Sequence, residues 1–224
     1  MTTVLTGRAL VKAYDGTPAL RGLDVELAEG EVLAVTGASG RGKSTLLHCL
    51  AGIVVPDAGE VQFGQVRVDR ASERDRSALR RTSFGVLFQF GQLVPELTAV
   101  ENVALPLLLD RRPRDGALAA ARTWLERLGV ADQADSRPGQ MSGGQTQRVA
   151  VARALVSEPR VVFADEPTGA LDSLAGEQVL GELLRVARES GTAVVLVTHE
   201  ARVAAYADRE IVLRDGRLAV GACR

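Results

Sequence analysis

The sequence has few of the features that mark secreted, disulfide-stabilised or nucleic-acid-binding proteins. Its 224 residues include two cysteines, Cys49 and Cys223, which excludes a disulfide-rich scaffold and fits a reducing cytoplasm. The 27 basic and 28 acidic residues leave a formal net charge of -1. No overall basicity therefore points to nucleic acid, and we expect no nucleic-acid partner.

Long apolar runs are also absent. The first ten residues contain no apolar stretch of the kind that signal peptides carry. No window approaches the roughly 18 consecutive apolar residues of a membrane span, and the closest, residues 103–109, is interrupted by Pro106. We therefore expect the chain neither to be secreted nor to cross a membrane by itself.

Lysine is almost missing. Lys12 and Lys43 are the only two, so arginine supplies the other 25 of the 27 basic residues. A motif that requires lysine is therefore less likely to occur by chance in this chain than in a chain of ordinary lysine content. Hydrophobic residues make up 46% of the chain, which is ample for a buried core, and Cys49 in an apolar run is expected to belong to it.

Strand and helix patterns alternate at both ends of the chain. The helical middle contains no convincing strand. The charged stretch 69–81 is expected to be a solvated loop. Expected strands are residues 9–14, 19–27, 31–36, 84–88, 161–164, 193–198 and 211–213, with a hairpin over 59–68, and expected helices are 43–51, 98–109, 115–128, 144–156, 174–189 and 201–206.

This order predicts an α/β fold with a parallel sheet and helices on its faces. The early hairpins indicate a small antiparallel sheet on one side, and the helical middle indicates an insertion. We expect one domain over residues 1–224. Within it, about residues 1–88 and 158–224 form the α/β core with its antiparallel β subdomain, and about residues 89–157 form an inserted α-helical subdomain.

The most specific local motif is G-x-x-x-x-G-K-[ST], placed between an apolar strand and a helix. Glycines let backbone N–H groups approach phosphate oxygens, and the helix N-terminus adds its positive dipole end. Lys43 supplies a charge to the phosphates, and the Ser44 hydroxyl suits Mg²⁺. The alternative is a Gly-rich turn with a chance lysine, which the strand and helix disfavour. The expected nucleotide-binding residues here are Gly37, Ala38, Ser39, Gly40, Arg41, Gly42, Lys43, Ser44 and Thr45.

Two adjacent carboxylates follow the apolar run 161–164. Asp165 is placed to hold Mg²⁺ at the carboxyl end of a strand, where ligands of open α/β sheets bind. We expect Glu166 to face elsewhere, because neighbouring strand residues alternate, which leaves it free to polarise a water molecule. Alone this pattern is common in α/β proteins; beside a phosphate loop it becomes specific.

A third motif precedes the predicted helix 144–156. In Met141-Ser142-Gly143-Gly144-Gln145, Ser142 is expected to cap the helix, and the glycines leave its first amides open. The alternative interpretation is an ordinary capped helix. The chain would then contain a second helix N-terminus that can bind an anion, besides the one after the phosphate loop, which supports a nucleotide site.

Taken in order, these motifs resemble the ABC ATPase family over roughly Val4 to Val220. The order is the phosphate loop, Gln89 after a strand, Ser-Gly-Gly-Gln, the Asp-Glu strand, and His199 at the end of another strand. The resemblance implies a P-loop NTPase (RecA-like) core with an antiparallel β subdomain and an inserted α-helical subdomain. It also implies binding of ATP and Mg²⁺ and hydrolysis of ATP.

Nucleotide-binding roles follow from the resemblance. Tyr14, in Lys-Ala-Tyr, matches the aromatic residue that stacks on adenine. The residues Ser142, Gly143, Gly144 and Gln145 match the signature that contacts the γ-phosphate bound by the other subunit, and Asp172 matches the loop that crosses the dimer interface. Met141 replaces the family's usual leucine, a swap of similar volume, and Arg41 stands at a variable loop position.

Catalytic roles follow in the same way. The resemblance implies Glu166 as general base, His199 as the switch histidine that bonds to the γ-phosphate, and Gln89 as the glutamine that senses Mg²⁺ and water. The implied metal site consists of Ser44, Gln89 and Asp165. Every residue that the family's chemistry requires is present, so we expect a competent ATPase.

Residues 166–173 and 90–102 resemble one branch of the family, which contains macrolide exporters, lipoprotein-release ATPases, antimicrobial-peptide resistance ATPases and the cell-division ATPase. The branch implies a homodimer that sandwiches two ATP·Mg²⁺. It also implies a separate transmembrane permease that docks near Phe90 to Leu97, with the subunit peripheral on the inner face of the plasma membrane. The chain ends soon after Gly216, so we expect no C-terminal regulatory domain.

Three functions stay open at this point. The first is export or extraction of a drug, peptide or lipid-linked substrate. The second is mechanotransmission to a membrane partner without solute transport, as in cell division. The third, a soluble ABC ATPase acting on nucleic acid or ribosomes, is disfavoured because no basic stripe is present and such relatives usually carry two ATPase domains.

Overall fold

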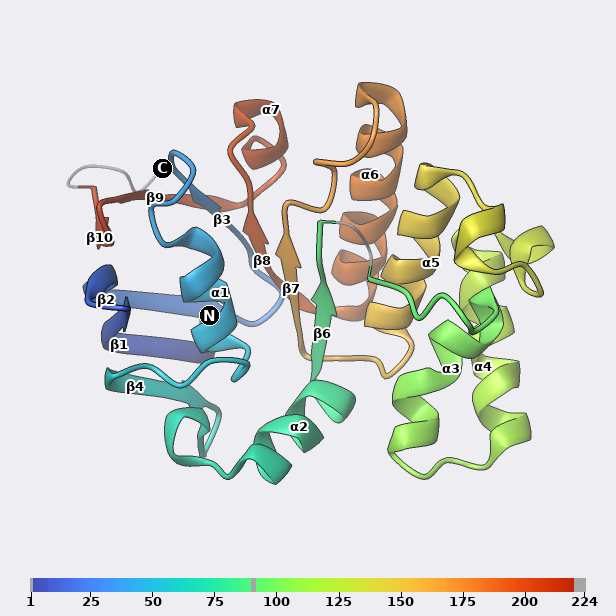
Figure 1. The fold of residues 1–224 in the computed structure, drawn as a ribbon, viewed down its shortest axis with the longest axis horizontal. Coiled ribbons are helices and arrows are strands. Elements are labelled where there is room, and N and C mark those ends of the chain that lie inside the picture. The colour runs from blue at the N-terminus through green and yellow to red at the C-terminus, as the bar shows by residue number, and fades with distance from the viewer. Residues whose placement is uncertain (1, 90–91, 220–224) are drawn as a thin grey trace.

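The computed structural model describes residues 2–89 and 92–219 (Figure 1). A six-stranded sheet with the order β10-β9-β3-β8-β7-β6 forms the centre. Its strands are β3 (Val32–Thr36), β6 (Phe84–Leu87), β7 (Val161–Asp165), β8 (Ala193–Val197), β9 (Arg209–Arg214) and β10 (Arg217–Leu218). All neighbours pair in parallel except β9 and β10. The strands β3 and β8 are buried throughout because apolar side chains cover both faces.

A second, antiparallel sheet has the order β2-β1-β4-β5. It contains β1 (Thr3–Tyr14), β2 (Thr17–Ala28), β4 (Ala58–Phe63) and β5 (Val66–Arg67). Strand β1 begins well before the predicted residue 9. The apolar alternation breaks where Ala9 adopts φ 48° in a bulge and donates its N–H to Asp24 Oδ1 at 2.6 Å.

Helix α1 (Lys43–Leu50) lies between the two sheets (Figure 1). Its buried side chains join one hydrophobic cluster with residues of both sheets. Within this cluster Phe84 makes edge-to-face contacts with Phe63 and Phe163, with ring centroids 4.8 and 5.2 Å apart. The phosphate-loop helix is therefore fixed from both sides, and Cys49 is buried in the core as predicted.

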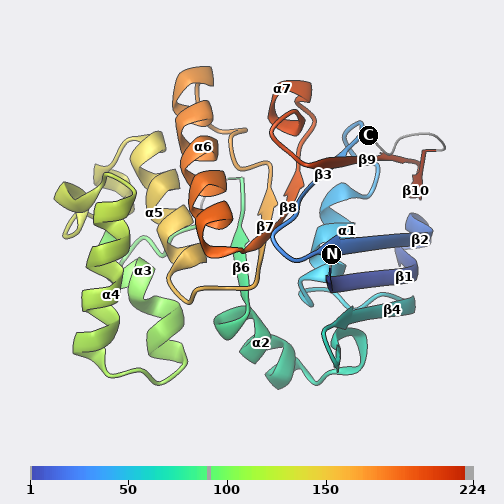
Figure 2. The same ribbon diagram turned by 180° about the vertical axis from the view of Figure 1, so that it is seen from behind.

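The remaining long helices lie on the opposite side of the parallel sheet from α1 (Figure 2). They are α3 (Ala99–Leu109), α4 (Arg114–Arg127), α5 (Gly143–Leu155) and α6 (Ser173–Ser190), and a short α7 (Ala201–Ala204) follows β8. Helices α5 and α6 pack on the sheet, and α3 and α4 pack on α5. Their apolar side chains form a second hydrophobic cluster with β7 and β8. Among the described residues no helix combines the length and apolarity needed to span a membrane. The two sheets and the helical layer confirm the predicted α/β architecture.

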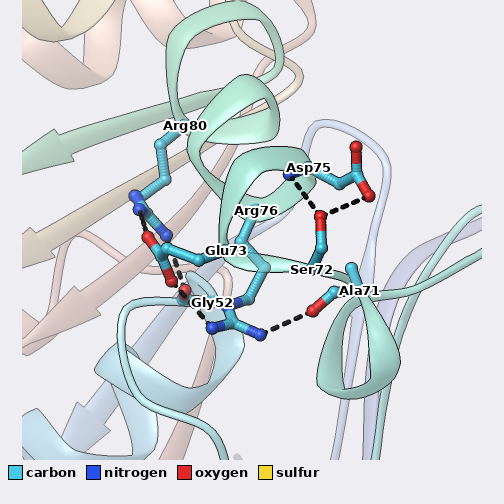
Figure 3. A network of polar contacts seen from close by, with 7 residues as sticks. All are labelled: Gly52, Ala71, Ser72, Glu73, Asp75, Arg76 and Arg80. Carbon is cyan, nitrogen blue, oxygen red and sulfur yellow. Dashed lines mark hydrogen bonds and ion pairs between the residues drawn. The ribbon is translucent and has the colours of Figure 1, made fainter.

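The prediction of a solvated loop over 69–81 is wrong. After a short 3-10 turn (Val68–Arg70), residues Glu73–Thr82 form helix α2, which Ser72 caps by accepting from the Asp75 N–H at 3.2 Å (Figure 3). Arg76 and Arg80 both pair with Glu73 along the helix. Arg80 also donates to the Gly52 carbonyl at 2.6 Å, which ties α2 to the end of α1. The high charge density reflects ion pairs on a half-buried helix.

Candidate nucleotide-binding and hydrolysis site

The phosphate loop connects β3 to α1 and fits closely between two other strands. Gly37 has φ 137° and Gly42 has φ 95°, both outside the range that favours other residues. A Cβ on Gly37 would lie 2.3 Å from the Leu213 carbonyl oxygen, and one on Gly42 would lie 2.3 Å from that of Ala19. Only glycine therefore allows this loop to pass between β2 and β9.

Lys43 is 6% exposed, and its ammonium lies inside the loop. Its Nζ donates to the carbonyl oxygens of Gly37 at 2.8 Å and Ala38 at 3.1 Å. Within the described residues this ammonium forms no ion pair. A buried charge without a counter-charge is costly, so the loop is suited to an anion.

The end of β7 meets the start of α1. Ser44 Oγ donates to Asp165 Oδ1 at 3.1 Å, which brings a hydroxyl and a carboxylate together beside Lys43. Hard oxygen ligands of this kind suit Mg²⁺, which usually takes one or two protein ligands plus phosphate oxygens and water. The described part of the chain contains no cluster of three or more His, Cys, Asp or Glu side chains that could hold a metal ion without phosphate or water ligands.

Glu166 and His199 meet at the ends of β7 and β8. His199 Nδ1 lies 2.5 Å from Glu166 Oε2, and the Glu166 N–H donates to the Val197 carbonyl at 2.9 Å. The expected reason for the orientation of Glu166 is wrong: β7 ends at Asp165, and Glu166 turns away because it adopts φ 48°. A left-handed backbone, and not strand alternation, separates the two carboxylates.

Gln89 follows β6 and lies against the loop after Glu166. A Cβ built on Gly169 would lie 2.9 Å from Gln89 Nε2, so the glycine makes room for the amide. The buried amide of Gln147 in α5 lies next to both segments: its Nε2 donates to the Pro167 carbonyl at 2.8 Å and to that of Phe88 at 3.4 Å.

The Ser-Gly-Gly-Gln segment forms the start of α5. Ser142 caps the helix as predicted: its Oγ accepts from the Gln145 N–H at 3.3 Å, and Gln145 Oε1 accepts from the Ser142 N–H at 2.8 Å. Figure 1 shows α5 and α1 on opposite sides of β7 and β8. No hydrogen bond or ion pair between described residues joins this segment to the phosphate loop of its own chain. Asp172 caps α6, accepting from the Ala175 N–H at 3.0 Å.

Tyr14 ends β1 and is 46% exposed, which leaves its ring accessible. The Lys12 ammonium lies 5.7 Å from the ring centroid and 2.7 Å from Asp57 Oδ1. The hydrogen bond with Asp57 raises the pKa of Lys12, and the same bond lowers the pKa of Asp57. Asp57 also accepts from the Ala13 N–H at 2.8 Å, so the strand end that carries Tyr14 is fixed.

Three features of the site were not predicted. Arg41 forms an ion pair with Asp215, which connects the phosphate loop to the β9–β10 turn. The buried Asn102 side chain holds the segment before α3, and Gln147 links three motifs. A polar residue inside an apolar helix pattern is the feature that would have revealed the last two. Of the predicted docking segment, Phe90 and Gly91 lie outside the described residues.

Comparisons with known proteins agree with this geometry. The sequence model of the family described as ABC transporter matches residues 20–169. The lipoprotein-releasing system ATP-binding protein LolD of Bordetella pertussis is 48% identical over 218 residues, which cover 96% of this chain and 94% of the relative. The macrolide export ATP-binding/permease protein MacB 1/2 of Paracoccus denitrificans is 48% identical over 199 residues, 89% of this chain but 30% of that longer protein.

A solved structure shares the fold. The dimeric ATP-binding cassette MJ0796 in a post-hydrolysis state, bound to ADP and Pi, superposes with a TM-score of 0.89 at 36% identity, covering 96% of each chain. This similarity confirms the P-loop core with an antiparallel β subdomain and a helical subdomain. The chain thus belongs to the ABC transporter family, in the branch of the lipoprotein-releasing and macrolide-export ATP-binding proteins, and is an ATP-binding subunit that hydrolyses ATP to drive transport.

Proposed function

We propose that this subunit binds ATP and Mg²⁺ in the phosphate loop and hydrolyses ATP only after a second copy has completed the site. The observation that carries the proposal is the buried, uncompensated ammonium of Lys43 beside the Ser44–Asp165 pair. In this assignment the residues 37–45 surround the phosphates and Tyr14 stacks on adenine. Ser44, Asp165 and Gln89 hold Mg²⁺, which supplies positive charge near the transferred phosphoryl group.

The test is Lys43→Ala. Removing a buried charge that faces the phosphates should lower ATP affinity by about two orders of magnitude or more, measured by titration calorimetry. Arg74→Ala, which removes an exposed cation of helix α2 away from the phosphate loop, is the matched control and should keep the affinity within about twofold. Tight ATP binding by Lys43→Ala would remove the phosphate loop from the account.

For hydrolysis, we assign Glu166 as the general base. Its carboxylate accepts a proton from the attacking water, and His199, 2.5 Å away, orients that carboxylate and contacts the γ-phosphate. Gln89 positions the same water from the neighbouring loop. These roles rest on the adjacency of the β6, β7 and β8 ends, which places all three side chains at one edge of the sheet.

The signature residues are assigned to the partner's nucleotide. Ser142 to Gln145 start a helix on the other side of the sheet from the phosphate loop of the same chain (Figure 1). A helix N-terminus suits an anion, and a two-fold arrangement brings this one to the nucleotide of a second copy. Asp172, exposed at the start of α6, then lies at the contact between copies. The dimeric form of the similar cassette MJ0796 supports this arrangement.

A permease helix is proposed to dock in a cleft of about 380 Å³ between α2, β6, α3 and α5. Its walls are largely apolar, and two cationic side chains, Arg80 and Arg153, lie among them. Of the predicted segment 90–97, only Gln92 is among the described residues that line the cleft. Leu93 instead packs against the helical core. Within this proposal, residues 89–157 form the subdomain that turns with the permease against the core of residues 1–88 and 158–224, with the subunit on the inner face of the plasma membrane.

The docking proposal is tested with Val86→Glu, since Val86 is half-buried and lines the cleft. The variant should lose co-purification with the permease at unchanged basal ATPase activity. The matched control is Val66→Glu, because Val66 is 41% exposed on β5, outside the cleft. If Val86→Glu still co-purifies with the permease like the control, the docking site lies elsewhere.

For the cargo, we propose export or extraction of a lipid-linked substrate, because the relatives named LolD match over nearly their whole length. The complex with its permease in liposomes tests this proposal: a lipidated protein should raise ATPase activity and leave the bilayer in an ATP-dependent manner. Stimulation without release would contradict the proposed cargo.

A further inference from the structure

One buried amide in helix α5 contacts the segments on both sides of the hydrolysis site. Gln147 is 3% exposed, and its Nε2 donates to two backbone carbonyls that are far apart in sequence. The Pro167 carbonyl, at 2.8 Å, belongs to the residue directly after Glu166. The Phe88 carbonyl, at 3.4 Å, belongs to the residue directly before Gln89. A primary amide has two N–H donors, so one side chain can serve both carbonyls.

The surrounding packing leaves these segments little freedom to move apart from α5. A Cβ on Gly85 would lie 2.3 Å from the Ala154 carbonyl, so α5 lies directly against β6. Farther along α5, Arg153 donates to the Gln92 carbonyl at 2.8 Å, beyond Gln89 in the chain. Helix α5 therefore holds the Gln89 segment at both ends, and through Gln147 it also holds the loop after Glu166.

We propose that Gln147 is a positioning residue for hydrolysis, which transmits the position of α5 to Glu166 and Gln89 together. Because α5 begins with the signature residues Ser142 to Gln145, contact between these residues and the partner's nucleotide would reach both side chains through a single amide. The inference rests on the roles of Glu166 and Gln89 in the proposed function. If Gln147 had only a structural role, it would satisfy the two buried carbonyls, and its loss would lower stability without lowering kcat.

The experiment is Gln147→Met, which keeps the length and removes both donors. Its matched control is Gln65→Met, the same change at an exposed position in the turn between β4 and β5, away from α5. Misalignment of the base should lower kcat about tenfold while KM and ATP affinity stay within about twofold, because the phosphate loop is untouched. In the Gln89→Ala background the loss should be smaller than tenfold, since the two changes disturb one arrangement.

Two results would overturn the inference: unchanged kcat, whether or not the melting temperature falls, or fully multiplicative losses in the double variant. If Gln147→Met does not fold, Gln147→Glu keeps the shape and donates only when protonated. At about pH 9, where the carboxyl is ionised and donates no hydrogen bond, its kcat should be lower than that of the wild type, and wild-type kcat at that pH would also refute the role. Glu166→Gln is assayed in parallel: wild-type turnover in it would refute the proposed base, independently of Gln147.

Discussion

Replacing Asn102 by leucine should destabilise the connection between the Gln89 segment and helix α3. Asn102 is fully buried. Its Oδ1 accepts from the Val94 N–H at 2.7 Å, and its Nδ2 lies within 3.0–3.1 Å of the carbonyl oxygens of Val94, Leu97 and Thr98. The amide has two hydrogens for three acceptors, so about three good bonds exist in total. At about 1 kcal/mol net for each, Asn102→Leu should cost about 3 kcal/mol of unfolding free energy.

Urea denaturation followed by circular dichroism measures this cost. With an m-value of about 2–3 kcal/mol/M, the midpoint should fall by about 1 M. The control is Thr123→Leu on the exposed face of α4, which should shift unfolding free energy by no more than about 0.5 kcal/mol. A midpoint for Asn102→Leu indistinguishable from the control would show that these bonds contribute nothing net, and the description of how residues 94–98 are held would be wrong.

Two further predictions concern single side chains. Burial raises the pKa of Cys49 to about 11, so in a Cys223→Ser background the native protein at pH 8 should react with a thiol reagent about 10²-fold more slowly than the denatured chain. Rapid labelling of the native protein would show an accessible thiol. His199→Ala removes the contact with Glu166 and should lower kcat about 10²-fold in a phosphate-release assay, with ATP affinity within about threefold. Unchanged kcat would exclude His199 from hydrolysis.

The parts of the site that sequence predicts well are local. The phosphate loop depends on a strand, a short glycine-rich turn and a helix within about 20 residues, and its residues are found in that arrangement. The Ser142 cap is local in the same sense. The parallel sheet follows from apolar runs that alternate with helical periodicity.

The parts that sequence does not predict depend on distant backbone. Gln147 and Phe88 are 59 residues apart in the chain, and nothing in a helical pattern shows that one glutamine is buried against two carbonyls. The sequence does not predict helix α2, because its charges suggest a solvated loop, whereas in the structure Glu73 pairs with both Arg76 and Arg80 within the helix. The orientation of Glu166 depends on a left-handed backbone conformation that a strand pattern cannot predict.

The most direct test of the account is the mass of Glu166→Gln in solution, with and without ATP. If the signature residues of one copy complete the nucleotide site of the other, the variant that cannot hydrolyse ATP should accumulate as a closed dimer. Light scattering should then give twice the 23.7 kDa monomer mass with ATP and Mg²⁺, and the monomer mass without nucleotide or in Glu166→Gln/Lys43→Ala. A Glu166→Gln protein that binds ATP tightly, fails to hydrolyse it and stays monomeric would contradict the shared site.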